Sequence, residues 1–169
     1  MKIYRDNELA TIPEFATEGS ACFDLRACFT EGDKIRAYNP HNKEMNLPVK
    51  MISGNVGVQL HAAFRTLIPT GLIFDIPKNH EMKIYVRSGL ALKYGITLAN
   101  NVAVIDSDYV EPTYVMLYNA SDTPIYIHHG DRIAQAQLIP LKSYSLTERK
   151  TRPEQKTDRV GGLGSTGAS

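Results

Sequence analysis

Two short polar segments of this chain combine residue types that can bind and attack a phosphate group. Arg87-Ser88-Gly89 places a guanidinium fork, a hydroxyl and an unhindered backbone together, and all three can donate hydrogen bonds to an anion. Asp106-Ser107-Asp108 follows an apolar run, and a carboxylate there can orient a water molecule or a metal ion. Taken alone, each segment is better explained by an ordinary role, as a helix cap and as a turn between strands.

Two further segments have the composition of ligand-binding sites. The run Gly130-Asp131-Arg132-Ile133-Ala134-Gln135 is a turn that leads into a strand, where Gln135 and Gln137 share one face. Residues 161–167, GGLGSTG, could wrap phosphates with their backbone N–H groups, although they lack the ending of a Walker loop. By composition alone, solvated glutamines and a frayed terminus are the commoner explanations.

The histidines and cysteines do not predict a dedicated metal or redox site. Adjacent residues on a strand face opposite sides, so His128 and His129 could not readily bind one ion together. Cys22 and Cys28 lack the close spacing of redox or zinc motifs. We interpret them as two small buried thiols in a reducing compartment.

The elements that must position these residues are predicted to be β-strands. Short runs rich in β-branched and aromatic residues alternate with turn signals such as Pro69-Thr70-Gly71, and no long stretch keeps an apolar stripe at helical spacing. The pattern predicts an all-β fold of the jelly-roll kind, with one short helical turn at Ser88–Tyr94. The predicted strand runs are 64–68, 72–76, 82–86, 113–118, 125–128 and 133–139.

The bulk composition fits one compact domain without a special partner. The chain has 169 residues, of which 43% are hydrophobic, enough for a single core. Its net charge of +1 gives no reason to expect a direct nucleic-acid or membrane partner. No window approaches a membrane span, so we expect a cytoplasmic protein, nuclear if eukaryotic or in the host cytoplasm if viral.

We expect one β domain over residues 1–146 with irregular additions. Residues Arg36–Asn55 are polar and rich in Asn, which predicts a long loop or an added hairpin. Residues 147–158 contain no apolar residue that could be buried, which predicts a solvated, flexible linker. The linker leads to the glycine-rich segment 159–169.

In their order and spacing, these segments resemble the five motifs of the trimeric dUTPase family. Five ordered matches between residues 16 and 167 are hard to obtain by accident. The resemblance implies a jelly-roll homotrimer with three active sites, each assembled from more than one subunit. It also implies that residues 159–169 close over a site when substrate binds. The motifs match residues 16–27, 87–96, 104–109, 130–135 and 161–167, and residues 65–72 match the strand before the second motif.

The resemblance further implies Mg²⁺-dependent hydrolysis of dUTP to dUMP and diphosphate, which limits uracil incorporation into DNA and supplies dUMP for dTMP synthesis. Asp106 would activate the water that attacks the α-phosphorus, and Asp24 would hold Mg²⁺ through a water molecule. Tyr109 would lie under the deoxyribose and exclude a 2′-hydroxyl. The other expected substrate-binding residues are Arg87, Ser88, Gly89, Asn100, Gln135, Arg159, Leu163, Gly164 and Ser165.

The chain departs from the family pattern at several positions. Val86 and Ala103 replace the usual Pro and Gly, and Leu163 stands where the family has Phe. The loss of that aromatic ring removes stacking over uracil. Arg159 also lies one residue nearer to this position than is usual.

Three alternatives belong to other classes of function. A dCTP deaminase-like relative would need a Glu on the strand after the third motif, whereas Tyr114–Asn119 contains no carboxylate. A protein of the same fold with a regulatory role would use the segment 36–55 to bind a partner. A structural jelly roll, such as a coat protein, would have no use for an acidic turn and a glycine-rich tail together.

Overall fold

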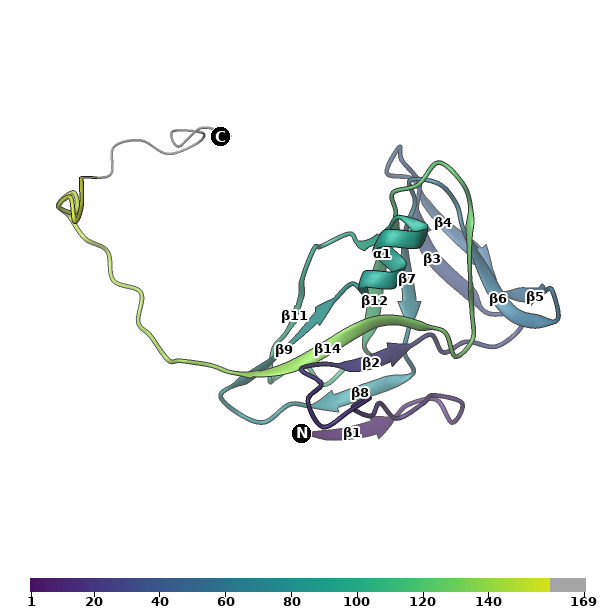
Figure 1. The fold of residues 1–169 in the computed structure, drawn as a ribbon, viewed down its shortest axis with the longest axis horizontal. Coiled ribbons are helices and arrows are strands. Elements are labelled where there is room, and N and C mark those ends of the chain that lie inside the picture. The colour runs from purple at the N-terminus through teal and green to yellow at the C-terminus, as the bar shows by residue number, and fades with distance from the viewer. Residues whose placement is uncertain (159–169) are drawn as a thin grey trace.

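The computed structural model describes residues 1–158 of the chain, and the expected contacts Arg159, Leu163, Gly164 and Ser165 lie outside the described residues. Within residues 1–158 the chain forms fourteen strands and one helix, which confirms the all-β prediction (Figure 1). The strands are β1 Lys2–Arg5, β2 Phe23–Arg26, β3 Lys34–Tyr38, β4 Glu44–Pro48, β5 Lys50–Ile52, β6 Asn55–Leu60, β7 Arg65–Pro69, β8 Leu72–Asp75, β9 His80–Tyr85, β10 Ile96–Leu98, β11 Ala103–Ile105, β12 Tyr114–Asn119, β13 Ile125–His128 and β14 Arg132–Pro140, and the helix is α1 Ser88–Tyr94.

The strands pair into four antiparallel sheets. The largest has the order β10-β12-β7-β3-β4, and the second has the order β11-β9-β14-β2. Two smaller sheets, β13-β6-β5 and β1-β8, complete the body. Strands that pair are often distant in sequence, as β2 and β14 are, so the fold brings the first and fourth motif segments side by side (Figure 1).

Alternation of apolar and polar residues explains why these segments are strands. Along β12, Val115 and Leu117 are buried, whereas Tyr114 and Met116, which alternate with them, are exposed. Such a period of two is typical of a sheet with one face on the core and one outside. In β9 the buried residues are Met82 and Ile84, and its polar residues lie on the outer face that carries the candidate site.

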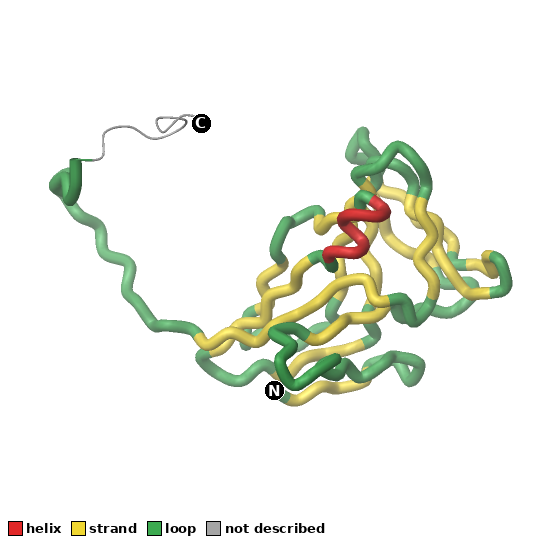
Figure 2. Tube along the Cα trace, in the orientation of Figure 1, coloured by secondary structure: helices red, strands yellow, loops and turns green. Residues whose placement is uncertain are grey.

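The six predicted strand runs are all strands, with ends shifted by one or two residues. The predicted helix at Ser88–Tyr94 has the same bounds in the structure, and Gly95 ends it in a left-handed conformation. The helix, red in Figure 2, packs through Leu90 against the core, and none of its residues is fully buried. The remaining strands were not predicted, since most are short or carry polar residues on their exposed faces.

The polar segment 36–55 is a hairpin rather than a long loop. It begins inside β3, turns at Asn42, whose φ is 59°, and returns as β4 with Tyr38 opposite Glu44. The Tyr38 hydroxyl donates a hydrogen bond of 2.6 Å to Glu44, and the Arg65 guanidinium lies 5.7 Å from the centre of the Tyr38 ring. The strands escaped prediction because only their inner residues, such as Ile35, are buried.

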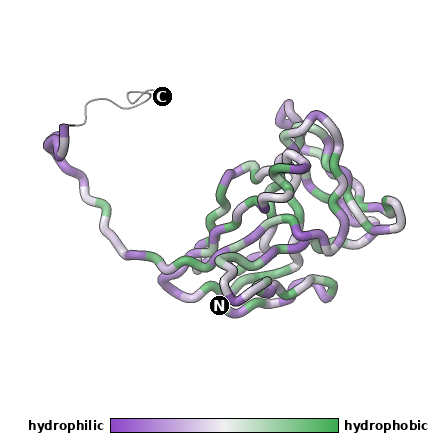
Figure 3. Tube along the Cα trace, in the orientation of Figure 1, coloured by the Kyte–Doolittle hydropathy of each residue, from purple (hydrophilic) through white to green (hydrophobic). Residues whose placement is uncertain are grey.

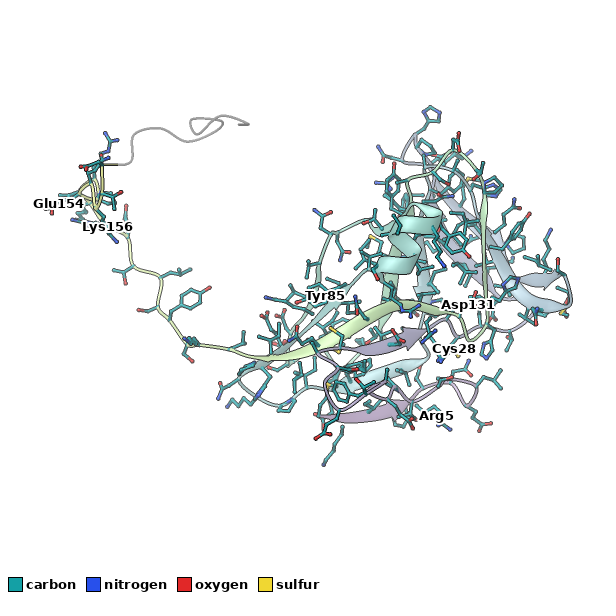
Figure 4. The ribbon with its side chains drawn as sticks, in the orientation of Figure 1. Arg5, Cys28, Tyr85, Asp131, Glu154 and Lys156 are labelled. Atoms are coloured by element: carbon teal, nitrogen blue, oxygen red, sulfur yellow. The ribbon has the colours of Figure 1, made fainter. Side chains whose placement is uncertain are left out.

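After β14 the chain leaves the body as an extended arm. Residues 141–158 form no helix or strand, and their side chains are exposed. Figure 3 draws the outer part of this arm as hydrophilic, and Figure 4 labels Glu154 and Lys156 far from the sheets. Near its base the arm exposes two large apolar side chains, Tyr144 at 84% and Leu146 at 90%. Among residues 1–158, no helix is long and apolar enough to cross a membrane.

Candidate functional site

One group of candidate residues converges on the outer face of the β11-β9-β14-β2 sheet. Arg87 follows β9, Asp24 lies in β2, and Gln135 in β14 sits opposite Asp24 in the sheet register. The Arg87 Nε donates to Asp24 Oδ1 at 2.8 Å, and the Gln135 Nε2 donates to the Val86 carbonyl at 3.0 Å. The structure therefore brings the expected phosphate-binding residues Arg87 and Gln135 together with Asp24.

The geometry leaves hydrogen-bond donors free for an anion. The Arg87 guanidinium also donates a long bond of 3.4 Å from Nη1 to the Arg132 carbonyl, so its second terminal nitrogen has no acceptor within the described residues. The Gln135 amide gives one of its two N–H groups to Val86, which fixes the direction of the other. An arginine fork and an oriented amide are suited to phosphate oxygens.

The start of α1 adds exposed donors beside Arg87. Arg87 is the N-cap residue, and no side chain caps the helix, so Ser88 does not act as the helix cap. The N–H groups of Ser88 and Gly89 belong to the first turn, where a helix has no internal acceptor for them. A Cβ at Gly89 would meet nothing within 4 Å, so the approach to this backbone is open.

A second group of candidate residues lies around the turn after β11. The Tyr109 N–H donates to the Asp106 carbonyl at 3.2 Å, which closes the turn, and the Tyr109 hydroxyl donates to the Pro112 carbonyl at 3.1 Å. Asp106 is exposed, and its carboxylate accepts no hydrogen bond from any residue of the described range. Ile105 and Tyr109, which precede and follow Asp106 in the sequence, line a groove of about 670 Å³.

Asn100 lies in the turn between β10 and β11, which belong to different sheets. It is exposed, and its carbonyl accepts a hydrogen bond of 2.7 Å from the Val102 N–H. Asn101 next to it has a φ of 60°, so the turn is tight and presents backbone groups outward. This turn leads into β11, which ends at Ile105, directly before Asp106.

The two groups are far apart within one chain. In the antiparallel pairing of β11 with β9, Ile105 lies opposite Met82, so the turn at Asp106 stands at the opposite end of β9 from Arg87. From Met82 to Arg87 is five residues, which at about 3.3 Å per residue is roughly 17 Å. Asp106 and Arg87 of the same chain are therefore separated by most of the length of β9.

The two cysteines differ in burial, and neither forms a disulfide within the described residues. Both are free, with Cys28 buried as expected and Cys22 only partly buried, so the expectation of two buried thiols was wrong for Cys22. Cys22 lines a small depression with Asp24 and Gln135. Burial, together with the neighbouring Asp24 carboxylate, raises the pKa of the Cys22 thiol, which keeps it in the unreactive protonated form.

The two histidines have separate roles in the turn before β14. The Phe29 N–H donates to His129 Nδ1 at 3.3 Å, while His128 Nδ1 lies 3.6 Å from Asp131 Oδ2. Residues 1–158 contain no cluster of three His, Cys, Asp or Glu side chains that could hold a metal ion by themselves. Each histidine therefore has a neighbour of its own, His129 at Phe29 and His128 at Asp131.

Comparison with known proteins identifies relatives of the whole chain. A family model described as dUTPase matches residues 52–167. A deoxyuridine 5′-triphosphate nucleotidohydrolase from Dinoroseobacter shibae is 38% identical over 161 residues, covering 95% of this chain and 90% of the relative. One of the same name from Brucella melitensis is 40% identical over 141 residues, covering 76% of this chain and 89% of the relative.

Solved structures show the same fold at low identity. The dUTPase of Staphylococcus bacteriophage 80alpha with dUPNHPP has a TM-score of 0.73 at 16% identity, covering 98% of this chain and 97% of the phage protein. A dUTPase from Streptococcus mutans has a TM-score of 0.62 at 21% identity, covering 82% of this chain and 91% of the other. These two similarities support the jelly-roll assignment.

Proposed function

The chain belongs to the dUTPase family, and on that basis we propose that it hydrolyses dUTP to dUMP and diphosphate. The observation that carries this proposal is the cluster of Arg87, Asp24 and Gln135. The fold brings these three residues from distant parts of the sequence onto one face of the β11-β9-β14-β2 sheet. By removing dUTP and producing dUMP, the enzyme limits uracil incorporation into DNA and supplies the precursor of dTMP. Such an enzyme acts on the nucleotide pool, so we propose that it works in the cytoplasm.

Each candidate residue receives one role in this reaction. Asp106 orients and deprotonates the water that attacks the α-phosphorus, for which its exposed carboxylate is free. Arg87, Gln135, Ser88 and the backbone of Gly89 bind the triphosphate and stabilise charge on the leaving diphosphate. The bond from the α-phosphorus to the bridging oxygen breaks as the bond to the water oxygen forms.

Mg²⁺ fits this site although few protein ligands are present. Mg²⁺ commonly binds through substrate phosphates and retained waters, so it needs only one or two carboxylates from the protein. Asp24 suits this role, because an ionised carboxylate has about four acceptor positions and two of them are engaged by arginines. When bound, Mg²⁺ supplies neutralisation of charge on the triphosphate.

We further propose that each active site combines Asp106 of one subunit with Arg87 of another, in a homotrimer. The separation of roughly 17 Å along β9 supports this assembly, because a neighbouring subunit could bring its Asp106 nearer to Arg87 than the residue of the same chain lies. Large apolar side chains are also exposed beside both groups, with Leu92 at 87% near Arg87 and Val104 at 51% near Asp106. Apolar residues in such positions are typical of surfaces that another protein covers.

Mixed oligomers test the shared site. Asp106→Asn and Arg87→Gln proteins, each nearly inactive, are unfolded together and refolded so that their subunits mix at random. Sites that take Asp106 from one variant and Arg87 from the other then regain both residues, and about a quarter of the wild-type activity returns. No recovery in oligomers shown to be mixed would contradict the shared site.

We propose that selectivity comes from the groove lined by Tyr109 and from the turn at Asn100. Tyr109 forms one wall of the groove, and we propose that the deoxyribose stacks there without room for a 2′-hydroxyl. The backbone at Asn100 would read uracil, since cytosine presents a donor where uracil presents an acceptor. These assignments follow the match of residues 104–109 to the third family motif.

Residues 159–169 complete the site in this proposal. The family match extends to residue 167, so it includes the glycine-rich segment. Arg159 would contact the γ-phosphate, while Leu163, Gly164 and Ser165 would cover the nucleotide. The exposed arm 141–158 precedes this segment in the chain and extends away from the sheets (Figure 1), which supports such a role.

One assay tests the proposed activity directly. The purified chain with Mg²⁺ is given dUTP, dCTP, dTTP or UTP, and release of diphosphate and of ammonia is measured. We expect diphosphate from dUTP at a rate far above that of the other three nucleotides. Ammonia from dCTP would indicate the deaminase reaction instead, which the absence of a carboxylate in β12 disfavours.

A further inference from the structure

A second arginine, Arg132, holds the other oxygen of the Asp24 carboxylate. Its Nη1 donates to Asp24 Oδ2 at 3.3 Å, while Arg87 Nε donates to Asp24 Oδ1 at 2.8 Å. The Asp24 and Arg87 side chains are 26% and 27% exposed, and that of Arg132 is 48% exposed. The carboxylate is thus fixed at both oxygens, one by each guanidinium.

A β-bulge brings Arg132 onto the same face as Asp24. In the pairing of β14 with β2, Arg132 lies opposite Arg26 and Gln135 lies opposite Asp24, so three residues of β14 span two of β2. The consecutive residues Ile133 and Ala134 are both buried as a result. In a regular strand, residues three apart would face opposite sides, and Arg132 would point into the core.

The turn before the bulge is held firmly in place. The Arg26 Nη1 donates to the Gly130 carbonyl at 2.7 Å, and the Ala27 N–H donates to the Asp131 carbonyl at 2.9 Å. The Asp131 carboxylate in turn accepts the His128 N–H at 2.8 Å. Figure 4 labels Asp131 at this end of β14 and Tyr85 on the neighbouring β9. Bulges near functional sites commonly redirect a side chain in this way.

We propose that Arg132 is a positioning residue, which keeps the Asp24 carboxylate in place while Arg87 binds the triphosphate. The ion pair joins Arg87 Nε to Asp24 Oδ1, so a shift of the Arg87 guanidinium toward phosphate would weaken it and let Asp24 rotate unless a second group held the carboxylate. Arg132 supplies that group from a different strand. It also leaves the cluster of two guanidiniums and one carboxylate with a net positive charge, which favours an anionic ligand.

This inference rests on the proposed function and predicts a specific energetic coupling between Arg132 and Asp24. The affinity of the full-length protein for the imido analogue dUpNHpp is measured calorimetrically with Mg²⁺ for the wild type, Arg132→Gln, Asp24→Asn and the double variant. We expect Arg132→Gln to weaken binding about tenfold in the wild-type background but less than about twofold in the Asp24→Asn background. A merely structural effect of Arg132 would appear equally in both backgrounds.

Two further variants separate positioning from charge. Arg132→Lys retains the positive charge but not the planar fork, so we expect it to bind about threefold more weakly than the wild type. The exposed Arg5 on β1, labelled in Figure 4 away from the cluster, provides the matched control, and Arg5→Gln should bind as the wild type does.

Several outcomes would overturn the inference. They are an equal loss in both backgrounds, no loss in Arg132→Gln, or full affinity in Arg132→Lys, which would assign the effect to charge alone. Should Arg132→Gln fail to fold, the Arg132→Lys variant serves the same comparison with Asp24→Asn. A wild-type protein that binds no dUpNHpp would contradict the proposed function itself.

Discussion

The phosphate-binding cluster of Asp24, Arg87 and Gln135 and the acidic turn at Asp106 differ in the interactions that their own chain provides. Around Asp24, ion pairs and hydrogen bonds join β2, β9 and β14 and fix the side chains of Arg87 and Gln135. Around Asp106, the hydrogen bonds are local, and the carboxylate has no partner within residues 1–158. In the proposed site, the group around Asp24 is therefore preorganised within the single chain, whereas the Asp106 carboxylate is exposed.

Under the proposed assembly, this difference would divide the chemistry between subunits. Groups that bind a charged substrate gain from being held rigidly before it arrives, because ordering them later costs free energy. A water-activating carboxylate needs an unoccupied oxygen, and Asp106 has two. Turnover, substrate affinity, sugar selectivity and stability can each be measured to compare the two groups.

The largest expected effect is the loss of turnover in Asp106→Asn. The amide cannot deprotonate water, so we expect the turnover number to fall about 10³-fold, within the range usual for removal of a general base. Because Asp106 supports no other side chain, affinity for dUpNHpp should change by less than about twofold. Diphosphate release and calorimetry measure the two quantities, and near-normal turnover would show that another group activates the water.

Deletion of residues 159–169 tests whether the phosphate-binding cluster and the acidic turn are sufficient for turnover without the glycine-rich segment. We expect turnover to fall about 100-fold, because the triphosphate would remain open to water and lose the Arg159 contact. The thermal midpoint of the body should stay unchanged within about one degree. Comparable losses of activity and stability would show that the segment is part of the folded body rather than a cover for substrate.

The Tyr109→Ala variant tests whether the residues of the acidic turn select the sugar of the nucleotide. Removal of the ring should open space beside the deoxyribose and reduce the preference for dUTP over UTP about tenfold, measured as the ratio of kcat/KM values. Tyr109→Phe is the matched control, since it loses only the hydrogen bond to the Pro112 carbonyl. An unchanged ratio in Tyr109→Ala would assign the selectivity to another residue.

The smallest expected effect compares the two aspartates by stability. Asp24→Asn removes interactions with two partly exposed arginines, which after solvent screening should cost about 0.5 kcal/mol in the free energy of unfolding. Asp106→Asn should cost nothing measurable, because the carboxylate makes no contact that the amide would lose. Denaturant unfolding of both variants gives the comparison, and a larger loss in Asp106→Asn would contradict the contrast between the two groups.

Much of the fold could be predicted from local patterns. The helix Ser88–Tyr94 and the strand Ile125–His128 have the predicted bounds, because Gly95 ends the helix and turn residues flank the strand on both sides. The hairpin of β3 and β4 could not be chosen over a loop, since its outer residues such as Arg36 and Glu44 are polar. Their pairing depends on a neighbour, β7, that lies far along the chain.

The candidate site was predicted as a set of residues but not as an arrangement. The motif order identified Asp24, Arg87, Asp106 and Gln135, whereas Arg132 was noted only as part of a motif. Its spacing of three from Gln135 on a strand would place the two on opposite faces, and only the bulge reverses this. No residue type at Ile133 or Ala134 signals that bulge in advance.

The sequence by itself determined the chemical groups, their order and the alternation that makes the chain a set of strands, because these properties belong to single residues and their near neighbours. Only the tertiary structure decided that Asp106 and Arg87 stand at opposite ends of β9 and that Arg132 meets Asp24. Both depend on strand register, which is set by contacts between segments distant in sequence. A shift of one residue would move every side chain of a strand to the other face.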